Sequence, residues 1–379
     1  MKIILAIDSF KGSLTSKETE SIVLQELKKL FPYSNIISIP IADGGEGFLS
    51  VISQNIPTTT HYIHAHNPCM EIIKTQYKIS LDKKTAFIEM ANINGLPLIR
   101  DEQKNPMLTS TFGTGEIIRD ALDKGCKKFI IGIGGSATND AGTGMLQALG
   151  YRFLDKRGKE LGHGGQILDK IYDIDLTQVH KGLENARFTV ACDVKNPFCG
   201  PSGAANIFAR QKGANDEMIL SLDKGMLNFA KIIYQKTGKD ILSIPGSGAA
   251  GGLGGGILAF LHAELQSGSK ILFNICNFYE KINHADLIIT GEGKIDNQTL
   301  MGKIPFQILQ AGLSKSIPVI AIVGKAENIN ELKQAGFEAI YETAPNSMTI
   351  EEAMKAEVAK ENIRRIIPKL ASTHLKSFI

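Results

Sequence analysis

The chain has 379 residues, with 42 Lys or Arg against 39 Asp or Glu, so its net charge is only +3. This near-balance excludes a broad basic surface and argues against nucleic acid or an anionic membrane as the main partner. Its 43% hydrophobic content excludes wholesale disorder, and no stretch approaches the roughly 18 apolar residues of a membrane-spanning helix. Five cysteines without a CxxC pair favour a reduced protein, which we expect in the cytoplasm.

The N-terminal segment predicts a βαβ unit. An apolar run at residues 3–7 indicates a buried strand, and Thr15 with Glu18 forms a possible capping box at the start of a helix. A second strand is predicted at residues 36–39. Strand, helix and strand in this order are typical of a parallel α/β sheet.

The C-terminal segment repeats the pattern, with strands predicted at 287–289 and 319–323. We therefore expect an α/β protein in which residues 1–64 and 283–379 form one Rossmann-like parallel-sheet domain. Residues 65–282 would form a second, inserted α/β domain. The alternative is a series of consecutive domains with boundaries near positions 150 and 280.

A polar loop follows the first strand and contains Asp8, Ser9, Lys11 and Ser13. In open α/β sheets, ligands bind beyond the carboxyl ends of the strands, so this loop is placed for function. Asp8 could accept a proton or hold a metal, and Lys11 could neutralise a phosphate. The alternative is a turn with a helix cap.

A second candidate segment follows the second strand and contains Asp43, Gly44, Gly45 and Glu46. Glycines let the backbone approach a ligand or a metal closely, and the two carboxylates flank them. A plain turn would rarely need both acids, so we predict a binding role here.

A third candidate segment, with Gly134, Gly135, Ser136, Thr138 and Asp140, lies between a predicted strand and a predicted helix. Backbone amides at a helix N-terminus bind anions, and the hydroxyls add donors. No Walker A pattern occurs in the chain. The alternative is a tight strand-to-helix turn with a Ser or Thr cap.

Gly246, Gly248 and Gly251 form a formal GxGxxG pattern. Its surroundings fit a dinucleotide fold poorly, because only Glu264 lies near the position of a ribose-binding acid. We predict a nucleotide or phosphate loop here, with an NAD-dependent oxidoreductase as a rival interpretation.

Three further acids are candidates for chemistry. Glu292 and Asp296 follow the strand at 287–289 and could bind Mg²⁺ directly or through water. Asp193 follows another apolar run. By contrast, the histidines at 61, 64 and 66 lack the second half of a zinc site, so we interpret them as a solvated strand edge.

In chain order, these segments resemble the type-1 glycerate kinase family of bacterial enzymes. The resemblance rests on the motifs DSFKGS (8–13), ADGGEG (42–47), GIGGSATND (132–140), DVKNP (193–197), QKGA (211–214), GSGAAGG (246–252), TGEG (290–293), QT (298–299) and GK (302–303). The chain departs from the family pattern at Ala141 and at Ala209-Arg210, and the second departure bears on the geometry of that loop.

The resemblance implies transfer of the γ-phosphoryl group of ATP to D-glycerate, forming 2-phosphoglycerate more often than 3-phosphoglycerate. It also implies two α/β domains with the active site in the cleft between them. Small-molecule substrates are the expected partners, and a homodimer is considered. A non-catalytic, two-lobed organic-acid binding protein is the second rival.

Phosphoryl transfer needs charge neutralisation, positioning and a group that takes the hydroxyl proton. On this basis we expect Asp8 or Asp193 to act as the base and Lys11 to act as a clamp on phosphate or carboxylate. Amides of Gly134, Gly135 and Ser136 would cradle anionic oxygens. Glu292 and Asp296 would hold Mg²⁺.

Overall fold

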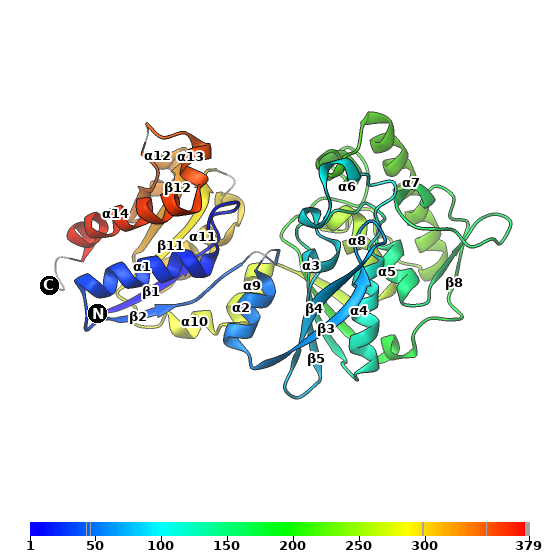
Figure 1. Ribbon diagram of the computed structural model, residues 1–379, viewed down its shortest axis with the longest axis horizontal. Coiled ribbons are helices and arrows are strands. Elements are labelled where there is room, and N and C mark those ends of the chain that lie inside the picture. Colours follow the sequence, from blue (N-terminus) through cyan, green and yellow to red (C-terminus); the bar gives the residue numbers. More distant parts are fainter. Residues whose placement is uncertain (43, 46, 298, 346, 376–379) are drawn as a thin grey trace. The chain divides into compact units, whose positions relative to one another are not determined.

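The computed structural model describes residues 1–42, 44–45, 47–297, 299–345 and 347–375, and it contains two compact units (Figure 1). Unit 1 combines Met1–Asp43 with Ser269–Ile379, and unit 2 is Gly44–Gly268. We predicted boundaries at 64/65 and 282/283. The boundaries of the units differ because strand 58–66 pairs within the sheet of unit 2, whereas Cys276 contacts the carbonyl of Pro40 in unit 1.

Unit 1 is built on a five-stranded parallel sheet in the order β13-β12-β11-β1-β2. Its strands are β1 (Lys2–Ile7), β2 (Asn35–Ser38), β11 (Leu287–Ile295), β12 (Val319–Ala326) and β13 (Ala339–Glu342). Its helices are α1 (Ser16–Leu30), α10 (Phe278–Lys281), α11 (Ile304–Leu313), α12 (Ile329–Gln334), α13 (Ile350–Met354) and α14 (Ala356–His374), and α9 (Gly268–Ile275) begins at its boundary. Both predicted sets of strands thus belong to one sheet.

Both faces of this sheet are covered. Ile3, Leu5 and Ile7 pack with the apolar sides of α1 and α14, which lie side by side in Figure 1. Side chains alternate along a strand, and Ile288 pairs with Ile4, which lies between Ile3 and Leu5. Ile288 therefore points to the opposite face of the sheet, where it approaches Gly312 of α11. The near-continuous apolar runs of the sequence follow from burial on both faces.

The order of the strands reverses between β1 and β11. The chain passes from β1 to β2 on one side, and from β11 through β12 to β13 on the other. In open α/β sheets, ligands bind beyond the carboxyl ends of the strands at such a reversal. The residues that follow β1 and the end of β11 therefore form the expected binding edge of unit 1.

Unit 2 has a six-stranded mixed sheet in the order β10-β9-β6-β5-β4-β3, in which β3, β4 and β5 pair antiparallel and the others pair parallel. Its strands are β3 (Thr58–His66), β4 (Ile72–Ser80), β5 (Thr85–Glu89), β6 (Lys128–Gly132), β9 (Arg187–Ala191) and β10 (Ala263–Gln266), with a separate pair β7 (Arg152–Leu154) and β8 (Asp173–Asp175). Its helices are α2 (Phe48–Asn55), α3 (Ala91–Asn94), α4 (Phe112–Asp123), α5 (Thr143–Ala148), α6 (Ala204–Phe208), α7 (Asp216–Thr237) and α8 (Ala249–Phe260).

The parallel sheet of unit 1, the mixed sheet of unit 2 and their helices confirm the predicted α/β class. His61, His64 and His66 lie on β3 at the edge of the sheet, as expected. In the described part of the chain, no helix is long and apolar enough to span a membrane.

Candidate active site

In unit 1, the loop after β1 is held against β11. The Asp8 amide donates to the Gly291 carbonyl at 2.9 Å, and the Ser9 amide donates to the Asp8 carboxylate at 2.7 Å. The register pairs Ile7 with Gly291, so the residues that follow, Asp8 and Glu292, are neighbours across the two strands. The side chain of Ser13 is in the same loop, and its buried hydroxyl has no hydrogen-bond partner among the described residues. Asp8, Ser9 and Ser13 thus lie at one end of the sheet, as predicted.

Glu292 is the acid best defined in this edge. Its side chain is 12% exposed, and it accepts a hydrogen bond from the Thr299 hydroxyl at 2.8 Å. Lys303 Nζ lies 3.9 Å from its other oxygen. Burial raises the pKa of Glu292, while the Thr299 hydrogen bond and the charges of Lys303 and Lys11 oppose that shift. Lys11 is therefore close enough to act on this carboxylate electrostatically.

The donor set of this edge fits Mg²⁺. Asp296 adds a second carboxylate, and its charge also raises the pKa of Glu292, as expected of a nearby negative group. Mg²⁺ is commonly held by one or two carboxylates together with substrate phosphates. Within the described ranges there is no group of three or more metal-binding side chains, and this mode of binding does not need one.

In unit 2, β6 leads into the predicted anion loop. The Gly134 amide donates to Gly44 at 3.4 Å, so it is occupied within the protein. The carbonyl of Gly135 and the amide of Ala137 are also bonded, to Leu96 and Asn94. In the described chain, the amides of Gly135 and Ser136 have no acceptor. Two of the three predicted cradle amides are thus available, and Gly134 is not.

Gly44 and Gly45 pack on this loop, backbone to backbone. A methyl group at Gly134 would lie 2.7 Å from the Cα of Gly45, and one at Gly132 would lie 2.3 Å from the Gly44 carbonyl oxygen. So close an approach requires glycine at positions 132 and 134. The structure thus joins the second and third predicted segments. Asp43 and Glu46 lie outside the described residues.

Asp140 holds the protein's own backbone. It is fully buried, and its carboxylate accepts hydrogen bonds from the amide and hydroxyl of Thr111 and from the amides of Gly142 and Gly144. Burial raises the pKa of Asp140 and these bonds oppose the shift. The first turn of α5 is therefore capped internally. This differs from our expectation of a helix N-terminus and an Asp140 carboxylate that face a ligand.

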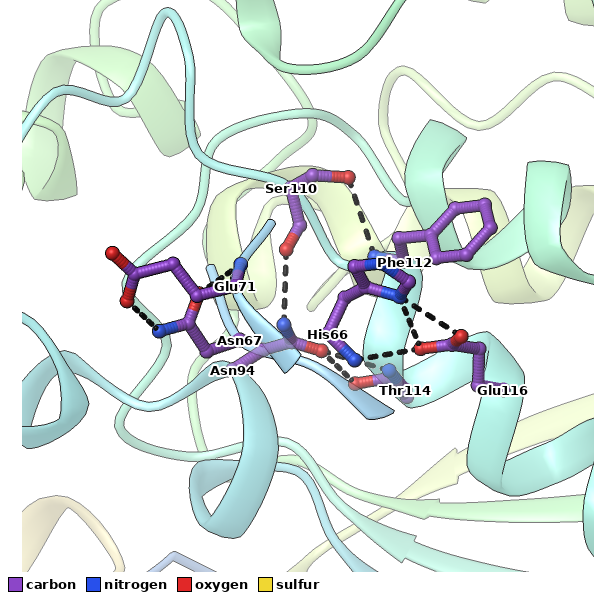
Figure 2. Close-up of polar contacts among 8 residues, drawn as sticks. All are labelled: His66, Asn67, Glu71, Asn94, Ser110, Phe112, Thr114 and Glu116. Carbon is purple, nitrogen blue, oxygen red and sulfur yellow. Dashed lines mark hydrogen bonds and ion pairs between the residues drawn. The ribbon is translucent and has the colours of Figure 1, made fainter. Parts of the chain in front are cut away.

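Asn94 also bonds to this loop, and Figure 2 shows the polar contacts of its side chain. Its side chain donates to the Ser110 carbonyl at 2.9 Å and accepts from the amide and hydroxyl of Thr114 at 2.8 and 2.6 Å. Its backbone carbonyl accepts from Ala137 at 3.0 Å. A buried and satisfied amide of this kind fixes the position of the loop.

Asp193 follows β9, as predicted, and is exposed. It accepts from the Ser267 hydroxyl at 2.8 Å and from the Gly268 amide at 3.2 Å, where α9 begins. In these contacts it acts as a helix cap.

The family model described as the glycerate kinase family matches residues 3–375 of this chain. The chain belongs to the glycerate kinase family. It is 41% identical to a glycerate kinase of Halalkalibacterium halodurans over 93% of both chains, and 40% identical to a glycerate 2-kinase of Escherichia coli K12 over 98% of both. A solved glycerate kinase 2 from Salmonella typhimurium LT2 has a TM-score of 0.85 and 38% identity, covering 100% of this chain and 98% of that one. Family membership makes the protein a phosphotransferase, as predicted.

Glycines of the segment 246–256 lie in close contact with neighbouring backbone in this member of the glycerate kinase family. Methyl groups at Gly248 and Gly251 would lie 2.1 Å from the carbonyl oxygens of Pro197 and Thr138. The segment leads into α8 without a preceding strand, and Gly251 has a φ of +67°. The strand-turn-helix context of a dinucleotide-binding motif is therefore missing.

Two residues of this kinase were not singled out from the sequence. Lys212 is 2% exposed, and its ammonium donates to the Ser136 hydroxyl and the Thr138 carbonyl. Glu89 ends β5 and accepts from the amides of Gly47 and Leu49, which caps α2. For Lys212 the available signal was its place in the QKGA motif. For Glu89 it was an acid within the apolar segment 86–90.

Proposed function

We propose that the protein transfers the γ-phosphoryl group of ATP to D-glycerate and forms 2-phosphoglycerate. The observation that carries this proposal is the full-length match to a relative named glycerate 2-kinase, at 40% identity over 98% of both chains. The polar edge of unit 1 and the anion loop of unit 2 supply the kinds of groups that phosphoryl transfer requires.

In this proposal, Asp8 accepts the proton of the attacking hydroxyl. Asp8 follows β1 at the reversal of strand order, next to Glu292, and the charge of Lys11 acts on Glu292. Asp193 is the weaker candidate, because both of its oxygens accept bonds at the start of α9. Lys11 is exposed and would neutralise a phosphate or carboxylate.

Glu292 and Asp296 would hold Mg²⁺, which when bound neutralises charge on the transferring phosphates. The amides of Gly135 and Ser136 would receive anionic oxygens of a substrate. We do not extend this role to Gly134 or Asp140, whose polar groups are bonded within the protein.

A coupled assay tests the proposal. Purified protein is mixed with ATP, Mg²⁺ and D-glycerate, and enolase with pyruvate kinase reads 2-phosphoglycerate, while ADP is followed separately. Signal through enolase without added mutase would support both the activity and the 2-position. ADP without enolase signal would indicate the 3-position, and absence of both would overturn the proposal.

A further inference from the structure

Lys212 is a buried ammonium in the wall of the anion loop. It ends the 3₁₀ helix η5 (Arg210–Lys212), and its Nζ lies 2.7 Å from the Ser136 hydroxyl oxygen and 2.6 Å from the Thr138 carbonyl oxygen. Among the described residues, no carboxylate forms an ion pair with it. A buried charge without an ion-pair partner is costly, so its retention needs a reason beyond packing.

The hydrogen-bonding roles in this pair are fixed by chemistry. An ammonium group has three donors and no acceptor, so the Ser136 oxygen must accept from Lys212. The Ser136 proton must then point toward some other acceptor. Within the described part of the chain, the Ser136 hydroxyl donates to nothing, although the side chain is only 7% exposed.

The neighbouring backbone also presents hydrogen-bond donors. The amides of Gly135 and Ser136 also lack acceptors among the described residues, and Gly135 is exposed. Two adjacent residues thus present two N–H donors and one O–H donor with no protein acceptor. A ligand that satisfies all three must bring lone pairs, which is the property of a carboxylate or phosphate oxygen.

We propose that Lys212 is a positioning residue that holds the Ser136 hydroxyl as a donor to an anionic oxygen of a substrate. The naming of that substrate as D-glycerate or ATP rests on the proposed function, and the same chemistry is present in the carboxylate of one and the phosphates of the other. Lys212 acts through Ser136 and not by its own contact with the reacting atoms.

The protonation of Lys212 supplies a readout. Burial lowers the pKa of Lys212 to about 7, and the charge of Asp140 opposes that shift. Of the other charged groups nearby, Arg210 pairs with Asp216, and Lys104, whose backbone lies against Gly213, pairs with Asp101. A neutral amine accepts hydrogen bonds, so above this pH the Ser136 proton can turn inward to Lys212. Affinity for the anion should therefore fall as pH rises through about 7.

The experiment measures binding at equilibrium, with ATP and D-glycerate titrated separately into the full-length protein by calorimetry. Ser136→Ala removes the hydrogen bond to the anion, and Lys212→Met removes the group that holds the Ser136 hydroxyl as a donor. Both variants should therefore weaken binding of the same one of the two ligands by about tenfold or more. The double variant should be no weaker than Lys212→Met alone. The identity of the weakened ligand tells which substrate supplies the oxygen.

Thr109→Val is the matched control. The Thr109 hydroxyl is buried and donates to the Ala137 carbonyl of the same loop at 3.0 Å, without contact with Lys212. This variant should lose stability but keep both affinities. If Lys212→Met does not fold, Ser136→Ala decides, because it should also remove the fall in wild-type affinity between pH 6 and 8.

The proposal is overturned by unchanged affinities in a folded Lys212→Met or Ser136→Ala protein, by additive losses in the double variant, or by wild-type protein that binds neither ligand. A failure of the proposed function can be distinguished from a failure of this proposal. A wild-type protein that binds ATP with the predicted losses in the variants, yet phosphorylates no glycerate, would retain the role of Lys212 and refute the glycerate kinase activity.

Discussion

The Ile7 amide donates to the carboxyl group of Glu20 at 3.0 Å, although Glu20 lies on α1 and is 1% exposed. β1 and β2 pair only as far as Leu5 and Ser38, so the sheet offers Ile7 no partner on that side. The Ser16 hydroxyl completes the arrangement by donating to the Ile7 carbonyl at 2.6 Å. Side chains of α1 thus take over the bonding of β1 immediately before Asp8.

This buried carboxyl group should make stability depend on pH. Burial raises the pKa of Glu20 from 4.5 to about 8. Between these values the folded protein holds a proton that the unfolded chain has lost, so the free energy of unfolding should decrease as pH rises. Glu20→Gln keeps an acceptor for Ile7 and places an uncharged amide against the Ser38 hydroxyl, which can accept from the amide instead of donating to the carboxyl group. Urea unfolding at pH 5 to 8 should show a decline for wild type and a flatter profile for Glu20→Gln.

Glu20→Ala is the contrasting variant, because it leaves the Ile7 amide and the Ser38 hydroxyl without their partner. It should cost about 1–3 kcal/mol for each unsatisfied group. Parallel pH profiles for wild type and Glu20→Gln would refute the assignment of the decline to this residue.

The two candidate bases are separated by substitution. Asp8→Asn should lower kcat by about 10²–10⁴-fold with little change in Tm, because the amide retains the size of the side chain but cannot take a proton. Asp193→Asn should have a smaller effect on kcat, since Asp193 caps the start of α9. Steady-state kinetics with circular dichroism checks both. The opposite order of effects would transfer the base role to Asp193.

The carboxylates at the end of β11 should set the metal requirement. Glu292→Gln and Asp296→Asn should each raise the Mg²⁺ concentration for half-maximal rate by about tenfold or more, since Mg²⁺ prefers charged oxygen ligands. Glu327→Gln serves as control, because Glu327 is half exposed and pairs with Lys294. A lower kcat with an unchanged Mg²⁺ requirement would contradict metal binding by these acids.

The effect of close packing at Gly251 on stability can be separated from the effect of its backbone conformation. Gly251 and Gly158 both have positive φ, at +67° and +74°, but only Gly251 has neighbours that a methyl group would strike. Gly158→Ala should therefore cost about 1–2 kcal/mol for its left-handed backbone. Gly251→Ala should cost several kcal/mol and lower activity, because the segment 138–139 must move. Equal losses of stability in urea unfolding would show that the contact is unimportant.

Contacts between residues close in the sequence could be predicted better than contacts between residues far apart in it. The capping box of Thr15 and Glu18 is present as expected, because its partners are three residues apart. The polar strand 58–66 carries little apolar alternation, so its place in unit 2 was missed. Asp140 looked like a ligand residue because its partner Thr111 lies 29 positions away. Lys212 and Ser136 are 76 positions apart, and the sequence around neither residue predicts their contact.

In unit 1, β1 needs a partner from the far end of the chain. The Lys2 amide donates to Asp286, 284 positions later, and β1 lies between β2 and β11. Unit 2 is one continuous segment, so it can fold before translation of the chain is complete. At about 5–20 residues per second, β1 waits on the order of tens of seconds for β11, with one apolar edge unpaired. During that interval this edge is open to pairing with another molecule.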